Sequence, residues 1–381
     1  MNIVALDIAS TSATYCVVGP KGLCAEGSLT FDYDGLESFI TTPQVRSADM
    51  FAMESTGGYH LPLYHFLLNH GLKARIINPL LIKRHQAAQT LRRTKTDRLD
   101  ALSIAGFAQR HISSLEEDRG VIDTESKMLA RRRARNAEDL AKAKTILKKD
   151  LSIAFPELLA LNVFTRSMLQ FLSLYGSAKD VLSVPNEELE QTLLLKRGRT
   201  SESINVKTIR NLADRSIGVS HHSFMVCDSA QRVLECQERD KQLTEALIEL
   251  EQTLHPKEME ILTSIPGIGP ITSAQFLSEI PDITRFATYQ KLLAFIGTDP
   301  GVYESGNTSR SMRISKKGNP ILRKYCYLMA DSCVKHNVVF NTYYHKKRDA
   351  GFPHRKAMIA TLNKLMRTVH ALLIKGEKYS I

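Results

Sequence analysis

The sequence predicts a mixed α/β domain at the N-terminus, a helical coiled-coil region in the middle and a mainly α-helical C-terminal domain. Up to about residue 112, short apolar runs separated by turn residues alternate with helical patterns. Long stretches with apolar residues at helical spacing follow, up to about residue 254. Beyond Leu262, Gly, Pro, Ser and basic residues gather between helical segments. We therefore expect three domains, with bounds at 1–123, 124–254 and 255–381.

The N-terminal part is predicted to contain five strands and four helices. The strands are expected at Asn2–Ile8, Ala13–Val18, Gly22–Phe31, Asp49–Met53 and Lys73–Asn78. The helices are expected at Asp34–Thr42, Tyr59–His70, Leu80–Arg93 and Thr96–His111. Three consecutive strands followed by strand–helix alternation indicate a mixed sheet flanked by helices.

Two long amphipathic helices dominate the predicted middle region. They span Lys127–Asp150 and Phe224–Leu254, and the second contains neither Pro nor Gly. Although their heptads are imperfect, we expect the two helices to pair as an antiparallel coiled coil. The polar segment Lys196–Asn205 is expected to be a loop, and further helices are expected at Leu322–Lys335 and Lys356–Ile374.

The charge of the chain favours a polyanionic partner. The formal net charge is +11 and the isoelectric point is about 9.3, and Lys and Arg that neutralise phosphates release condensed counterions. The alternative is a basic protein with no such partner. The six scattered cysteines form no CxxC pair, so neither a zinc site nor a disulfide framework is expected. No apolar run approaches the roughly 18 residues of a membrane span, so we expect a cytoplasmic protein without membrane contact.

Four acidic residues form the candidate catalytic and metal site. Asp7 and Glu54 end two predicted strands, and strand ends deliver side chains to one rim of a sheet. Asp97 and Asp100 are three apart on a predicted helix, which places both carboxylates on one face with Cβ atoms about 5–6 Å apart. Carboxylate oxygens are hard ligands suited to Mg²⁺ or Mn²⁺, and paired ions of this kind clamp a phosphodiester. The alternative is a set of turn and surface carboxylates, with Asp97 paired to a neighbouring arginine.

Candidate phosphate-binding residues cluster in the C-terminal part. The turn PGIGP contains Gly267 and Gly269 before a helical run, as in a helix-hairpin-helix module whose backbone N–H groups approach a phosphate. The alternative is an ordinary loop. Ser305, next to Gly306, is a candidate nucleophile among several nearby hydroxyls and needs activation. The basic and polar candidates for phosphate contact are Arg310, Arg313, Lys316, Lys317, Asn319, Arg323 and, on the first long helix, Arg131, Arg132 and Arg133; for the arginine cluster the alternative is a solvated face.

Several motifs carry a resemblance to a known family. ALDIAST, MESTGGY and KTDRLDALSIA resemble the N-terminal signatures of the DEDD insertion-sequence transposases, which include Piv-type DNA invertases. The resemblance implies a RuvC-like, RNase H-type fold, and the four acidic residues match the catalytic tetrad of the family one for one. The segment from Gly297 to Arg323 resembles the C-terminal transposase domain, and the catalytic serine of the family falls on Ser305. Thr298 departs from the apolar residue common in the family. The resemblance covers roughly residues 1–155 and 255–340.

The resemblance implies an enzyme that joins donor and target DNA under the direction of a structured RNA encoded by the element. Mg²⁺ on the tetrad and a covalent phosphoserine at Ser305 would carry the chemistry. The family works as a homodimer or homotetramer, and a composite site across subunits is expected because tetrad and serine lie in different domains. The expected place of action is the nucleoid of a bacterial or archaeal cell. Two alternatives stay open: a RuvC-like junction nuclease or Piv-type invertase that uses only the acidic site, and a nucleic-acid-binding scaffold without catalysis.

Overall fold

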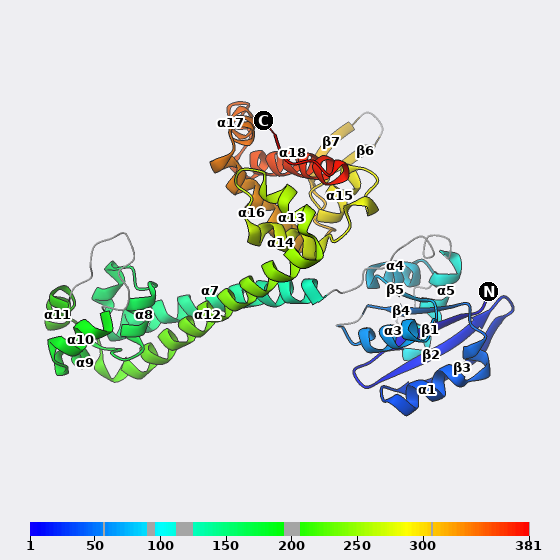
Figure 1. Ribbon diagram of the computed structural model, residues 1–381, viewed down its shortest axis with the longest axis horizontal. Coiled ribbons are helices and arrows are strands. Elements are labelled where there is room, and N and C mark those ends of the chain that lie inside the picture. Colours follow the sequence, from blue (N-terminus) through cyan, green and yellow to red (C-terminus); the bar gives the residue numbers. More distant parts are fainter. Residues whose placement is uncertain (56–57, 90–95, 112–124, 194–205, 306–307, 381) are drawn as a thin grey trace. The chain divides into compact units, whose positions relative to one another are not determined.

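The structure, a computed structural model, describes residues 1–55, 58–89, 96–111, 125–193, 206–305 and 308–380. The chain divides into two compact units, Met1–Asp123 and Thr124–Ile381, which are described in turn (Figure 1). Among the described residues, no helix combines the length and the apolar character needed to cross a membrane.

The first unit contains a five-stranded mixed sheet in the order β3-β2-β1-β4-β5. The strands are β1 (Ile3–Ile8), β2 (Ser12–Gly19), β3 (Gly22–Thr30), β4 (Met50–Glu54) and β5 (Ala74–Ile77). β1, β2 and β3 form an antiparallel meander, whereas β4 runs parallel to β1 and β5 parallel to β4. The mixed sheet and its five strands confirm the prediction for this part of the chain.

Helices cover both faces of this sheet, because its central strands alternate apolar side chains to the two sides. One face packs against α1 (Tyr33–Thr41), α2 (Pro43–Arg46) and α3 (His60–Asn69). The other face packs against α4 (Pro79–Gln89) and α5 (Asp97–Arg110). The helix predicted at Leu80–Arg93 extends beyond position 89, where this described segment ends.

The second unit is mainly helical and is built on two long helices, α7 (Glu125–Ala154) and α12 (Ser223–Leu254), which lie side by side in Figure 1. Asn136 Nδ2 donates to the carbonyl oxygen of Cys236 at 2.9 Å. His222, which immediately precedes α12, lies 3.3 Å from Asp150, near the end of α7. Residue numbers that rise on one helix and fall on the other confirm the expected antiparallel pairing.

Short helices pack around one end of this pair, at a hydrophobic core that contains Leu147, Phe155 and Phe171. They are η1 (Pro156–Ala160), α8 (Arg166–Leu172), α9 (Ala178–Ser183), α10 (Asn186–Leu193), α11 (Val206–Asp214) and η2 (Ser220–His222). The sequence analysis did not predict them, since six to nine residues are too few for a clear helical period. The predicted loop Lys196–Asn205 lies outside the described residues.

A second core of this unit joins the C-terminal helices to Ala130 of α7 and Leu247 of α12. The helices are α13 (Pro256–Thr263), α14 (Pro270–Glu279), η3 (Ile283–Arg285), α15 (Tyr289–Ile296), α16 (Pro320–His336), α17 (Val338–Asp349) and α18 (His354–Lys375). An antiparallel hairpin of β6 (Pro300–Ser305) and β7 (Thr308–Ile314) adds to the expected helices. Its sequence mixes Ser, Gly and Arg without a period of two, so no strand was predicted there.

Candidate functional site

Asp7 and Glu54 lie at the carboxyl ends of two adjacent parallel strands. Asp7 is the penultimate residue of β1 and Glu54 the last of β4. Leu6 faces Met53 across the two strands, so the next position on each strand holds an acidic residue. The meeting of these two residues at one rim of the sheet was expected from their strand-end positions. Both residues are partly buried.

These two carboxylates belong to the sheet face that α5 covers. Side chains of a strand alternate between faces, and Asp7 follows Ile3 and Ala5 in the row that packs against α5. On β4, Glu54 likewise follows Met50 and Ala52, which belong to the same core. Asp7 and Glu54 therefore continue the two rows of apolar side chains that pack against α5, each at the end of its row.

The first turn of α5 lies at the same end of the sheet. At the far end of the helix, Gln109 Nε2 donates to the carbonyl oxygen of Gly19 at 3.3 Å, beside the start of β1. From Gln109 back to Asp100 the helix covers about 14 Å. From Ile3 to Asp7 the strand covers about 13 Å. Because the two lengths are similar, the first turn of α5 lies toward the end of β1 that contains Asp7.

Asp97 and Asp100 extend the buried stripe of α5. They precede Ala101 and Ile104 by one turn each, and both of those residues pack on the sheet. Asp97 is exposed, whereas Asp100 is partly buried and accepts a hydrogen bond from Gln86 Nε2 at 3.0 Å. A helix N-terminus favours negative charge.

The alternative role of Asp97 is an ion pair with Arg93 or Arg98, the two arginines near it in the sequence, and the structure describes only Arg98. Arg98 lies 2.6 Å from Glu26, on β3. Arg93, the other proposed partner of Asp97, is outside the described residues. Gln86 is one residue that the sequence analysis missed, since its contact with Asp100 joins two helices and no motif marks it.

The four carboxylates suit a divalent cation by chemistry, because all supply hard oxygen donors on one side of one sheet. Within the described part of the chain, however, no three acidic, histidine or cysteine side chains converge closely enough to hold a metal ion. Like charges repel at short range, so a cation would be needed to draw these carboxylates together. The donor atoms thus suit Mg²⁺ or Mn²⁺ in kind, whereas the positions of the described side chains do not form a metal site.

His85, on α4, is placed for packing. Burial lowers the pKa of its imidazole, and the positive charges of Arg110 and His111 lower it further. Its ring stands edge-on to that of Phe107 at 5.7 Å between centroids. Phe107 is about two turns along α5 from Asp100, so His85 is directed away from the acidic residues.

The predicted hairpin motif with Gly267 and Gly269 forms the turn between α13 and α14. Gly267 has φ +99°, and a Cβ there would lie 2.8 Å from the Cα of Cys333 on α16. Gly269 is the N-cap of α14, and its N–H donates to Thr272 Oγ1 at 3.1 Å. Gly267 therefore has a packing role against α16, whereas the space beside Gly269 is open.

The ends of the β6–β7 segment are held together at two glycines. A Cβ on Gly297 would lie 2.7 Å from the backbone N of Gly318, so these two segments of the backbone are in contact. Lys316 has φ +52° and donates its N–H to the Gly297 carbonyl at 3.2 Å. Ser315 Oγ donates to Asp299 Oδ1 at 2.5 Å. Asp299, the acidic residue in this basic loop, thus holds the side chain of Ser315 in place.

Ser305 is the last residue of β6 and pairs with Thr308, the first residue of β7. Arg310 pairs with Tyr303, two residues from the position that faces Ser305. Gly306 lies outside the described residues, as do the side chains of Ser305, Arg310 and Arg313. The backbone therefore places Ser305 at the end of a two-stranded ribbon whose base is closed by Gly297 and Gly318.

Asn319 and Arg323, both predicted to contact phosphate, make hydrogen bonds inside the protein. Asn319 Oδ1 accepts from the N–H groups of Ile321 and Leu322, and its Nδ2 donates to Glu279 Oε2 at 2.7 Å. Arg323 Nη1 donates to the carbonyl oxygen of Ile296 at 2.9 Å. These contacts set the start of α16, whereas Lys316 and Lys317 are exposed.

The three arginines of α7 differ in their surroundings. Arg131 Nε lies 3.1 Å from Glu279 Oε1, and Arg133 Nε donates to Thr244 Oγ1 at 2.7 Å. Arg132 is exposed and lines an open groove between α7, α8, α10 and α12. Glu279, which is buried and accepts from both Arg131 and Asn319, was missed by the sequence analysis.

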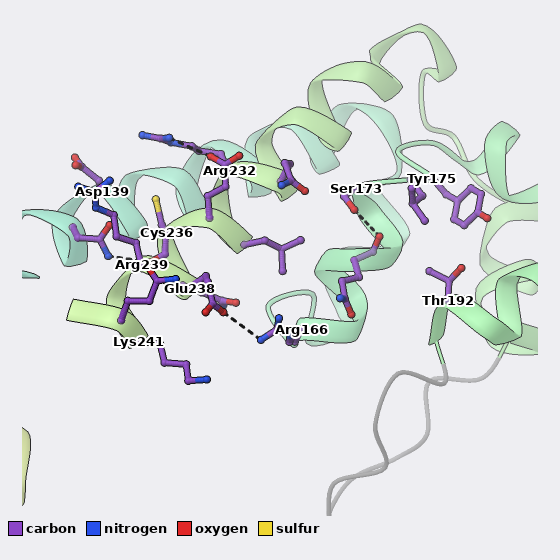
Figure 2. Close-up of a pocket in the computed structure, with 18 of the residues that line it drawn as sticks. Asp139, Arg166, Ser173, Tyr175, Thr192, Arg232, Cys236, Glu238, Arg239 and Lys241 are labelled. Atoms are coloured by element: carbon purple, nitrogen blue, oxygen red, sulfur yellow. Dashed lines mark hydrogen bonds and ion pairs between the residues drawn. The ribbon is translucent and has the colours of Figure 1, made fainter. Parts of the chain in front are cut away.

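The groove beside Arg132 has a mixed electrostatic character (Figure 2). Arg166 pairs with Glu238 at 3.6 Å, and Arg232 pairs with Glu235 at 3.3 Å. These pairs offset part of the positive charge. The basic residues that line the groove are Arg132, Arg135, Arg166, Arg232, Arg239 and Lys241.

Comparisons with known proteins match both ends of the chain. A family model described as a transposase matches residues 4–156, and one described as the transposase IS116/IS110/IS902 family matches residues 259–345. An uncharacterised 44.8 kDa protein of insertion element IS116 from Streptomyces clavuligerus is 23% identical over 88% of this chain and 85% of its own length. The transposase for insertion sequence element IS1111A of Coxiella burnetii is 24% identical over 90% and 82%. The pilin gene-inverting protein of Moraxella lacunata is 22% identical over 86% and 80%.

Proposed function

Because the chain belongs to the IS116/IS110/IS902 family of insertion-sequence transposases, we propose that it exchanges DNA strands with a serine nucleophile and a carboxylate-bound divalent metal, guided by a structured RNA. The observation that carries the proposal is the position of Asp7 and Glu54 at neighbouring strand ends, on the face covered by the helix that begins with Asp97. The proposal includes a RuvC-like, RNase H-type identity for the N-terminal unit.

The acidic residues would hold the metal and orient the phosphodiester. Asp7, Glu54, Asp97 and Asp100 would supply oxygen ligands. When bound, Mg²⁺ or Mn²⁺ would stabilise negative charge that develops on the phosphate oxygens. Gln86, through its hydrogen bond to Asp100, would fix the rotamer of that carboxylate.

Ser305 would form the covalent intermediate. Its Oγ would attack the phosphorus, so that the Oγ–P bond forms while the bond from phosphorus to the leaving deoxyribose oxygen breaks. The proton of the serine is lost and the leaving oxygen gains one, so that no external energy source is required. The support is the place of Ser305 at the end of a ribbon whose base Gly297 and Gly318 fix, close in sequence to the exposed Lys316 and Lys317.

Nucleic-acid binding would use the exposed cations. The net charge of +11 supports phosphate binding by DNA and RNA. The finer parts of the proposal are donor and target DNA as substrates, a guide RNA from the element, and a homodimer or homotetramer at the nucleoid. Donor and target discrimination would then come from base pairing with the RNA.

Site-specific DNA inversion is the second candidate function, because the pilin gene-inverting protein is similar along most of this chain. A junction nuclease or an inversion that uses only the acidic residues would not need Ser305.

A recombination assay in cells that carry donor, target and the element's flanking segment tests the proposal. Asp7→Asn and Ser305→Ala should each reduce recombination at least a thousandfold. Ser309→Ala, on β7, is the matched hydroxyl control and should retain activity. Recombination by Ser305→Ala at the wild-type rate would exclude the serine mechanism, whereas full activity of Asp7→Asn would exclude the metal site.

A further inference from the structure

Positive charge is concentrated at the corner between α17 and α18. The residues that carry it lie outside the matched family segments and are not among the proposed catalytic residues. The matched segment ends at residue 345. In the next eleven positions the chain contains one acidic residue, Asp349, and five cations. We call these five the corner patch: Lys346, Lys347, Arg348, Arg355 and Lys356.

The corner patch has no acidic partners. Within the described part of the chain, no ion pair within 4.0 Å joins any of its five cations to a carboxylate. Arg348 donates only to the backbone carbonyl of Phe352, at 2.9 Å. Four of the five side chains are exposed and Lys347 is half-buried. The charge is therefore available to a ligand.

Aromatic rings hold the lysines of this corner in place. Lys356 Nζ lies 4.3 Å from the ring centroid of Phe352, and Lys347 Nζ lies 5.3 Å from the same centroid. Lys364, two turns further along α18, lies 4.6 Å from the centroid of Tyr343. Cation–π contact restrains flexible side chains while leaving their N–H groups to bind anions. Less conformational entropy is then lost when a ligand binds.

No acidic residue in the first turn of α18 offsets the positive end of the helix dipole. Cations in a first turn oppose the positive end of the helix dipole, and His354, Arg355 and Lys356 occupy that turn. The N-cap, Pro353, makes no side-chain capping hydrogen bond to the first N–H groups. A phosphate at this end would accept from free backbone N–H groups and would offset both the dipole and the cations.

The patch also continues toward the candidate catalytic loop. Asn363, next to Lys364 on the same helix, donates to the carbonyl oxygen of Thr298 at 3.4 Å. Thr298 follows Gly297, whose carbonyl accepts from Lys316. From Lys356 to Asn363 is about 10 Å along α18, which equals the axial rise of about three nucleotides of one DNA strand.

We propose that the corner patch is a binding site for a phosphodiester backbone, about 10 Å along α18 from the contact between Asn363 and the loop that contains Ser305. The site recognises phosphates and not bases, because it consists of cations and backbone N–H groups. It extends the proposed function by adding a backbone contact outside the catalytic residues. Duplex DNA and RNA share this chemistry, and the test separates them.

The test measures equilibrium binding of the full chain to a 30-base-pair duplex and, separately, to a single-stranded RNA of 30 nucleotides, in EDTA and over a range of salt. Arg355→Gln/Lys356→Gln removes two charges from α18, and Lys346→Gln/Arg348→Gln removes two from α17. Lys207→Gln/Lys257→Gln is the matched control, since both residues are exposed lysines of the same unit and are in no ion pair with a described carboxylate. Thermal unfolding of each variant should equal that of the wild type.

Each lost phosphate contact should reduce the slope of log K against log salt by about 0.9 for duplex DNA and about 0.7 for a single strand. We expect each corner double variant to reduce the slope of log K against log salt by about 1.4–1.8, and we expect the control to leave that slope unchanged. A change with the duplex alone identifies DNA as the ligand, a change with RNA alone identifies RNA, and a change with both identifies the shared backbone. Slopes equal to those of the control with both probes would overturn the proposal. Because the test measures equilibrium binding and not strand exchange, its result is independent of the test of Ser305.

Discussion

Asn319 and Glu279 are 40 residues apart in the chain, and Asn319 Nδ2 lies 2.7 Å from Glu279 Oε2. Arg131 of α7 contacts the other carboxylate oxygen at 3.1 Å. One buried carboxylate therefore joins α7, α14 and the start of α16. Asn319 uses its side-chain oxygen to cap α16, so its main effect on the basic loop is to fix where the loop ends.

Replacing this carboxylate should destabilise the second unit. Glu279→Gln keeps the shape but removes the charge that Arg131 and Asn319 contact. We expect a loss of about 1–3 kcal/mol in the free energy of unfolding, discounted because Arg131 is partly exposed. Urea denaturation measures it. Glu249→Gln on α12, at an exposed site, is the control and should change the free energy by less than about 0.5 kcal/mol. Equal effects for the two variants would contradict the role of Glu279.

Gly267 and Gly269 should respond differently to alanine. Gly267→Ala combines a positive φ with a clash against the backbone of Cys333, and we expect a loss of more than about 3 kcal/mol. Gly269→Ala has open space and a negative φ, so its loss should stay below about 1 kcal/mol. Denaturation of the two variants in parallel checks this, and a tolerated Gly267→Ala would refute the packing against α16.

Stability of the second unit should depend on pH through Glu251. Burial raises the pKa of this carboxyl from 4.5 to about 7, while the hydrogen bond from Ser126 lowers it. The folded protein thus keeps a proton that the unfolded chain has lost between these values. Stability from this group is present below about pH 4.5 and is lost as pH rises to about 7, by about 3 kcal/mol.

Glu251→Gln should remove this dependence and raise stability at pH 8. Denaturation midpoints of wild type and variant between pH 5 and pH 8 give the comparison. His255 lies 3.9 Å from the carboxylate, so His255→Gln is measured beside it to isolate the contribution of Glu251. A wild-type pH profile that Glu251→Gln leaves unchanged would contradict the prediction.

Divalent metal should bind the first unit through the acidic residues. We expect Mn²⁺ to raise the unfolding temperature of the full chain, because binding to the folded state alone stabilises it. Asp7→Asn and Glu54→Gln should each abolish most of that shift. Asp34→Asn, an exposed acidic residue of α1, is the control. The same shift in Asp7→Asn as in the wild type would place the metal elsewhere.

The sequence was sufficient for the elements that have a strong local pattern. β1 and β4 were predicted because each is a short apolar run, with an acidic residue next to the end of β1 and at the end of β4. α7 and α12 were predicted because their apolar period extends over many turns. The hairpin with Ser305 was missed because the sequence of β6 and β7 has no alternation of apolar and polar residues.

Contacts between distant residues could not be predicted in the same way. Arg131, Arg132 and Arg133 look alike in sequence, yet only Arg132 of the three is exposed. The difference depends on Glu279 and Thr244, which lie more than 100 residues away. The direction of a charged side chain follows from its packing environment, which a single sequence does not encode locally.

The most direct test of the serine mechanism is to detect the covalent intermediate. The protein is incubated with labelled donor and target DNA, the element's RNA and Mg²⁺, then denatured, digested and analysed by mass spectrometry. The account predicts a nucleotide attached to Ser305 in the wild type and none in Ser305→Ala, while Ser309→Ala retains it. Strand exchange with no adduct at Ser305, or an adduct at another residue, would contradict the account.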